Sequence, residues 1–312
     1  MSKRSLPVII LVALLALVAG SCSSAPADES IDAGSTDGAP ATLAFSETLT
    51  AAAAANSARF EGRYTITGVD GATSGDSDPA SAVELAMSGS FDIEAEAMEM
   101  TIDLGDFLAS GLVGDGFGIP PGFEGFLSEP MKIVVIGTEG WLNWSVLSLF
   151  TGQEDAWMAL GADEIGTATE DFGLAGGAAN PTEVLAALAG ADAAVEDLGL
   201  ETVRDVQTRH WRALVDLASV SAELDPIERA ALEAKVGPLT TTEFPLELWI
   251  AVDDGLLRRY SIEVPGEAIA ADAPSSVGAV ELVVDIYDYG TDVGIIAPPP
   301  DQVVSGEGLL MP

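Results

Sequence analysis

The stretch GLETVRDVQTRHWRALVDL, residues 199–217, decides the fold of this chain. From Thr202 to Leu217 it is rich in β-branched and aromatic residues and contains neither glycine nor proline, which predicts a long strand. From Trp211 onward the residues alternate: Trp211, Ala213, Val215 and Leu217 fall on one side, and His210, Arg212, Leu214 and Asp216 on the other. We therefore expect one side to face an apolar interior and the other a wetter surface.

The segments that follow this stretch predict further strands joined by tight turns. Residues 244–252 (FPLELWIAV) place Leu246, Leu248, Ile250 and Val252 on one face. Asp253-Asp254-Gly255 is typical of a hairpin turn, and residues 256–264 then place Tyr260, Ile262 and Val264 on one side. Residues 277–289 predict the last long strand, 301–304 close the domain, and 305–312 are expected to be a tail.

The segments that precede it predict the same kind of meander. Strands are expected at 58–67, 83–93, 98–104, 131–137, 140–144 and 156–160, with a connector at 145–153. Met98, Met100, Ile102 and Leu104 alternate with polar residues, which indicates a strand with one buried face. A helix is expected at 42–55. Two short helices with capping residues begin at Asn180 and Asp225 and must pack on the sheet to be stable.

Residues 106–129 combine many glycines with many large apolar side chains. The glycines disfavour a regular helix or strand, and the apolar side chains disfavour full exposure to water. Two interpretations remain: an irregular loop packed on the core, or a mobile flap at the mouth of a cavity with Phe117 and Phe123 as flap residues.

The composition excludes several classes of function. Among 312 residues, 50 are acidic and 12 basic, for a net charge of −38, so the chain repels nucleic acid. Since 48% of the residues are hydrophobic, it is not a disordered acidic tail. One cysteine and one histidine allow neither an internal disulfide nor a Cys/His zinc site, and no D-x-D-x-D-G calcium loop occurs. We expect no metal and no cofactor.

The N-terminus has the three parts of an export signal. Lys3 and Arg4 precede an apolar run at residues 6–18, which is too short to span a bilayer, and small residues follow. The sequence Ala19-Gly20-Ser21-Cys22 resembles the lipobox of bacterial lipoproteins, which implies acylation of Cys22 and removal of residues 1–21. The alternative is an ordinary signal peptide with an incidental cysteine. Residues 22–41, rich in small and polar residues, are expected to form a flexible tether.

Catalytic motifs are missing from the sequence. There is no G-x-S-x-G elbow, and His210, the sole imidazole, lies within a predicted strand, which favours a structural histidine over a general base. Five arginines (Arg204, Arg209, Arg212, Arg258 and Arg259) gather in the predicted strands around 199–217 and 256–264. We expect them to pair with carboxylates; holding an anionic lipid head group is the alternative.

Several of these motifs, in this order, resemble the LppX/LprAFG lipoproteins of the LolA-like fold. The resemblance rests on ETVRDVQTRHWRALVDL, on FPLELWIAVDDGLLRRYSIEV, on the closing APPPDQVV, and on GTEGWLNW followed by AWMAL. It implies an α+β fold over residues 42–304, in which a strongly curved antiparallel sheet, a half-barrel, wraps around a few short α-helices and encloses an apolar cavity.

The same resemblance implies a non-enzymatic, lipid-anchored protein at the extracytoplasmic face of the cell membrane. We expect it to be a monomer that binds and carries a lipid or glycolipid. Cavity candidates are Leu246, Leu248, Ile250, Tyr260 and Ile262, with Phe117 and Phe123 at the flap. The alternative is a regulatory or interaction lipoprotein with a filled core that acts through protein contacts.

Overall fold

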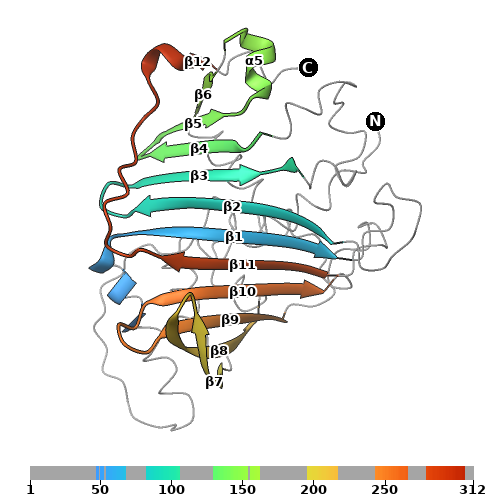
Figure 1. The fold of residues 1–312 in the computed structure, drawn as a ribbon, viewed down its shortest axis with the longest axis vertical. Coiled ribbons are helices and arrows are strands. Elements are labelled where there is room, and N and C mark those ends of the chain that lie inside the picture. Colours follow the sequence, from blue (N-terminus) through green and yellow to red (C-terminus); the bar gives the residue numbers. More distant parts are fainter. Residues whose placement is uncertain are drawn as a thin grey trace, which may run out of the picture.

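The computed structural model describes residues 47–67 without 49 and 53, 82–105, 129–153, 155–161, 195–216, 243–265 and 279–305. Within this part a single twelve-stranded sheet dominates the molecule (Figure 1). Its strands are β1 (Ser57–Thr67), β2 (Val83–Asp92), β3 (Ala97–Asp103), β4 (Met131–Ile136), β5 (Glu139–Asn143), β6 (Trp157–Leu160), β7 (Val195–Val203), β8 (Val206–Asp216), β9 (Glu243–Ala251), β10 (Leu257–Pro265), β11 (Ala279–Tyr287) and β12 (Val303–Ser305). The short helices α5 (Val146–Thr151) and η4 (Pro300–Gln302) accompany it, and residues 47–55 are helical wherever they are described.

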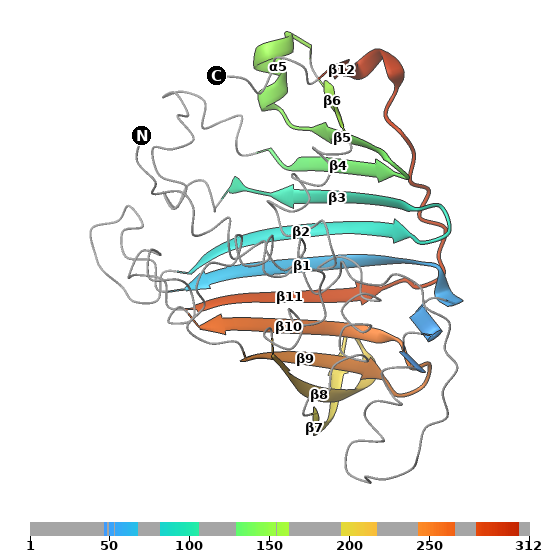
Figure 2. The ribbon, with the colours of Figure 1, turned by 180° about the vertical axis from the view of Figure 1, so that it is seen from behind.

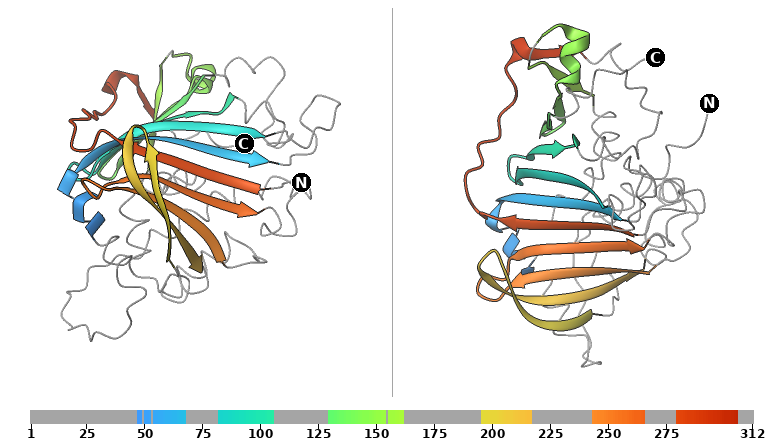
Figure 3. Two further views of the ribbon diagram at one scale, coloured as in Figure 1. Left: turned by 60° about the horizontal axis from the view of Figure 1, so that its bottom comes forward. Right: turned by 45° about the vertical axis from the view of Figure 1, so that its right-hand side comes forward.

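The sheet consists of two antiparallel meanders that meet at β1 and β11. The spatial order is β12-β6-β5-β4-β3-β2-β1-β11-β10-β9-β8-β7, and only the β12–β6 pair is parallel. The chain between β11 and β12 runs past the ends of β1 to β5 and joins the two meanders (Figure 2). The sheet is strongly curved (Figure 3). It does not close into a barrel, because β7 and β12 stand at opposite ends of the strand order. This is the curved antiparallel fold expected from the sequence.

The stretch at residues 199–217 forms a hairpin instead of the one long strand expected from Thr202 onward. Arg204 and Asp205 have φ values of 46° and 66° and turn the chain between β7 and β8. Positive φ at both central residues of a two-residue loop is the primed turn whose twist matches that of paired strands. The expectation was wrong because neither residue is glycine, the usual signal of such a turn.

Two smaller expectations were also wrong. The connector expected at 145–153 contains helix α5, which is only six residues long and carries no side-chain cap. Val252 does not share the buried face of Leu246, Leu248 and Ile250, because it lies in the turn after β9 and is 55% exposed. The two capped helices and residues 106–128 lie outside the described residues.

Each strand separates an apolar face of the sheet from a polar face. In β1, Phe60, Tyr64 and Ile66 are buried, whereas Glu61 and Arg63 between them are exposed. We call the first side the apolar face and the second the polar face. The apolar face carries one continuous cluster of buried residues from β1 to β4 and from β8 to β11. Its alternation follows from the period of two along a strand.

Close packing on the apolar face requires glycine at one point. A Cβ atom on Gly89 would lie 2.7 Å from the Phe60 ring and 2.2 Å from the backbone oxygen of Glu99. Gly89 in β2 is paired with Phe60 in β1, so the missing side chain makes room for the aromatic ring.

The described residues contain no helix long and apolar enough to cross a bilayer.

Candidate functional site

The apolar face brings together the cavity candidates that the structure describes. Leu248 pairs with Tyr260 and Leu246 with Ile262 across β9 and β10, so the four form one contiguous patch. Leu246, Leu248 and Tyr260 are buried, Ile250 is 6% exposed, and Ile262 is half-buried at the margin of the cluster. Phe117 and Phe123 lie outside the described residues. The patch is an apolar surface on which hydrocarbon can pack without desolvating a charge.

Two tyrosine hydroxyls on this face find no hydrogen-bond partner within the described part of the chain. The side chains of Tyr64 and Tyr260 are buried, yet neither Oη atom meets a donor or acceptor among the described residues. Burial raises the pKa of both phenols well above the ordinary value, so both hydroxyls stay protonated and act as neutral donors. Tyr289 differs, because its hydroxyl donates to the backbone oxygen of Leu257 over 2.7 Å. The sequence predicted Tyr260 as a cavity candidate from its place on the strand. It did not predict Tyr64 as one.

The polar face over β7 to β9 carries a network around the only histidine. His210 is 6% exposed, and its ring stacks on Trp249 with centroids 4.1 Å apart. Nδ1 lies 3.0 Å from Glu201 Oε1, and Nε2 lies 3.0 Å from Glu247 Oε2. The imidazole is therefore held on both sides by a carboxylate and on one face by an indole. This arrangement matches the structural histidine expected from the sequence.

Glu201 also accepts a hydrogen bond from the Trp249 indole at 2.8 Å. This bond, followed by the one to His210, lowers the pKa of the Glu201 carboxyl below its ordinary value. A second group on the same face behaves alike. Arg204 contacts Glu61 at 2.8 Å and stacks on the Tyr287 ring, and it lowers the pKa of the Glu61 carboxyl.

All five arginines that the sequence singled out meet a carboxylate, as expected. The contacts are Arg204 to Glu61 at 2.8 Å, Arg209 to Asp197 at 2.5 Å, Arg212 to Glu247 at 2.7 Å, Arg259 to Asp285 at 2.5 Å, and Arg258 to Asp254. These cations are therefore occupied by the protein's own acids.

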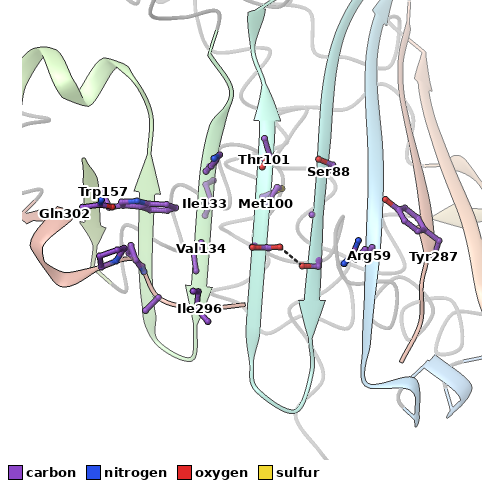
Figure 4. Close-up of a pocket in the computed structure, with 17 residues that line it drawn as sticks. Arg59, Ser88, Met100, Thr101, Ile133, Val134, Trp157, Tyr287, Ile296 and Gln302 are labelled. Atoms are coloured by element: carbon purple, nitrogen blue, oxygen red, sulfur yellow. Dashed lines mark hydrogen bonds between the residues drawn. The ribbon is translucent and has the colours of Figure 1, made fainter. Parts of the chain in front are cut away.

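A hollow of about 700 Å³ lies on the polar face over β1 to β4 (Figure 4). Arg59 and Lys132 line it, and they are the basic residues of the described part that make no ion pair. Trp157 and Tyr287 stand at opposite sides of the hollow, and Ile296 and Gln302 of the chain before β12 border it. The hollow is open and has a mixed lining, in which charged and hydroxyl side chains alternate with apolar ones such as Trp157 and Ile296.

No cluster of three or more His, Cys, Asp or Glu side chains suited to a metal ion occurs among the described residues. In the described part of the chain, both ring nitrogens of His210 contact carboxylates and its ring stacks on an indole, which are the contacts of a structural histidine.

Comparison with known proteins gives similarities among solved structures alone. No family model and no curated protein sequence matches the chain. The lipoprotein LppX of Mycobacterium tuberculosis is similar at 16% identity over 83% of this chain and 100% of that chain, with a TM-score of 0.45. LprF from Mycobacterium bovis is similar at 10% identity over 83% and 97%, with a TM-score of 0.40. A LolA superfamily protein from Nitrosomonas europaea is similar at 11% identity over 84% and 96%, with a TM-score of 0.23.

These neighbours include the LppX and LprF proteins that the sequence resembles, and the likeness concerns the fold.

Proposed function

We propose that the chain is an exported, membrane-anchored lipoprotein that binds and carries a lipid or lipidated molecule. The observation that carries this proposal is the continuous apolar face, which spans eight strands of a sheet that does not close on itself. Of the buried polar residues in the described part, Ser90, Thr208 and His210 belong to the polar face. Apart from the hydroxyls of Tyr64 and Tyr260, acyl chains that lie against the apolar face therefore meet apolar side chains.

Burial of hydrocarbon alone supplies the affinity that a carrier needs. Each buried methylene contributes roughly 0.8 kcal/mol, so acyl chains that bury about twenty methylenes contribute about 16 kcal/mol. If association costs about 8 kcal/mol, about 8 kcal/mol remains, which corresponds to a dissociation constant of about 1 μM. No reaction is required, and the protein is proposed to be non-enzymatic and monomeric.

Native mass spectrometry of the full-length protein, purified from the envelope of its host, tests lipid binding. We expect a co-purifying lipid in the native chain and less of it in Ile262→Trp, which fills space on the apolar face. Leu214→Trp is the matched control, because Leu214 is 40% exposed and lies on the polar side of β8. Repeated absence of lipid from the native protein would sink the proposal. A regulatory or interaction lipoprotein with a filled core, acting through protein contacts, would then be the better account.

We also propose that Cys22 anchors the protein at the extracytoplasmic face of the cell membrane, through the tether of residues 22–41. Support comes from the lipobox-like sequence Ala19-Gly20-Ser21-Cys22. Replacing Cys22 by serine should release the chain from the membrane fraction, whereas Ser23→Ala should leave it there. An unchanged distribution of the Cys22→Ser variant, with no acyl mass on the native N-terminus, would exclude the anchor.

A further inference from the structure

Tyr64 and Tyr260 occupy one region of the apolar face although they come from opposite ends of the domain sequence. Tyr64 in β1 and Tyr260 in β10 are separated by one strand, β11. Tyr64 pairs with Leu282, and Tyr260 pairs with Val284, two residues further along β11. Two strand spacings and two residues of rise place their Cα atoms about 12 Å apart. The two positions therefore lie within the length of a single lipid molecule.

Their hydroxyls are costly where they stand. A buried hydroxyl without a partner loses its hydrogen bonds to water and gains none in return. Phenylalanine would fill the same space without this cost, and the neighbouring Phe60 shows that the face accepts that ring. Two such hydroxyls on one face indicate that their partners arrive with the bound molecule.

The chemistry of the face limits what those partners can be. The phenols are neutral donors, and the buried cluster of the apolar face contains no charged residue among those described. An ionised carboxylate placed there would be a buried charge without a counter-ion, which is strongly unfavourable. A neutral acceptor attached to hydrocarbon fits both conditions, and the ester carbonyl of an acylated lipid is such an acceptor.

We propose that Tyr64 and Tyr260 donate hydrogen bonds to ester carbonyls of the carried lipid, and that the protein selects acyl-ester lipids over ether-linked lipids and free fatty acids. This inference rests on the proposed function, because it names the ligand class and the selecting residues of the same face.

Binding of a diacylglycerol and of its diether analogue with identical chains tests the inference on the full-length protein. We expect the native protein to bind the diester more tightly than the diether. Tyr64→Phe and Tyr260→Phe should each weaken diester binding about fivefold, the loss of one neutral hydrogen bond, and leave diether binding unchanged. The melting temperature of each lipid-free variant should stay equal or rise, because an unpartnered hydroxyl has been removed.

Tyr289→Phe is the matched control, because its hydroxyl already bonds to the Leu257 backbone oxygen. This variant should melt at a lower temperature and keep the native preference for the diester. Equal native affinity for diester and diether would overturn the inference and leave lipid carriage standing. Equal loss of both ligands in the Tyr64 and Tyr260 variants, with lowered melting temperatures, would also overturn it, since that result is expected of hydroxyls held by buried water. Failure of the native protein to bind either lipid would refute the proposed function itself.

Discussion

At the scale of single residues, the polar face shows how an acidic chain uses its few cations. His210 lies between Glu201 and Glu247, and Arg212 shares Glu247 with it over 2.7 Å. Such pairs at a partly exposed surface contribute little individually, but shared carboxylates join β7, β8 and β9 into one network. This network holds the hairpin β7–β8 against the rest of the sheet.

The lowered pKa of Glu201 makes the stability of this region depend on acid. The ordinary value is 4.5, and the folded value lies below it, so the unfolded chain takes up the proton first as the pH falls. The stabilisation is therefore complete above pH 4.5 and disappears below it. We expect melting temperatures measured across this range to fall less steeply for Glu201→Gln than for the native protein. Glu139→Gln removes the same charge from the start of β5 and should follow the native curve. Equal slopes for all three proteins would refute the assignment.

Gly89 is the residue at which the apolar face tolerates least change. A methyl group there must displace the Glu99 backbone or the buried Phe60 ring. We expect Gly89→Ala to lower the free energy of unfolding by about 1–3 kcal/mol in urea titrations. Ser88→Ala, at the exposed neighbouring position, should change it by less than about 0.5 kcal/mol. Equal effects of the two substitutions would show that the close approach is not limiting.

At the scale of elements, local patterns predicted the strands, because their signal is the alternation of residues i and i+2. β2, β3, β9 and β10 agree with expectation to within about two residues. The turn at Arg204 and Asp205 was missed because two polar residues there adopt a conformation that glycine usually marks. Helix α5 was missed because a helix of six residues has no periodicity to detect.

The site was predictable to the same extent. Leu246, Leu248 and Tyr260 follow from alternation alone. The unpartnered hydroxyls and the histidine network depend on residues far apart in sequence, such as Glu201 and Trp249, which are 48 positions apart. Such pairs depend on which strands are neighbours in the sheet, and local sequence patterns do not show the strand order.

Strand β12 closes a small cluster of its own at one end of the sheet. Leu147, Ala156, Met158 and Leu160 pack together there, and Val304 covers them. We expect a chain that ends at residue 294 to exchange the amide hydrogens of β6 and α5 at least about tenfold faster, while β1 and β11 keep their protection. A chain that ends at residue 305 retains β12 and is the control. Uniformly faster exchange throughout the truncated chain would show that this end is not a separate unit.

At the scale of the whole molecule, the dominant feature is a net charge of −38. Most of the described basic side chains already form ion pairs on the polar face. The many other carboxylates therefore repel one another across the surface. Screening reduces this repulsion, since the Debye length falls from about 30 Å at about 0.01 M salt to about 3 Å at about 1 M. We expect the melting temperature to rise with sodium chloride over this range. A flat or falling curve would show that local ion pairs outweigh the global repulsion.

The two edge strands of the sheet, β7 and β12, bear on the size of the ligand that we propose. In a closed barrel, strand number and stagger fix the girth. A sheet with two edge strands is not bound by that relation. Small changes of twist between neighbouring strands add up, and they change the distance between the two edges without breaking hydrogen bonds between strands. The same open sheet can therefore narrow around a small ligand and widen around a large one.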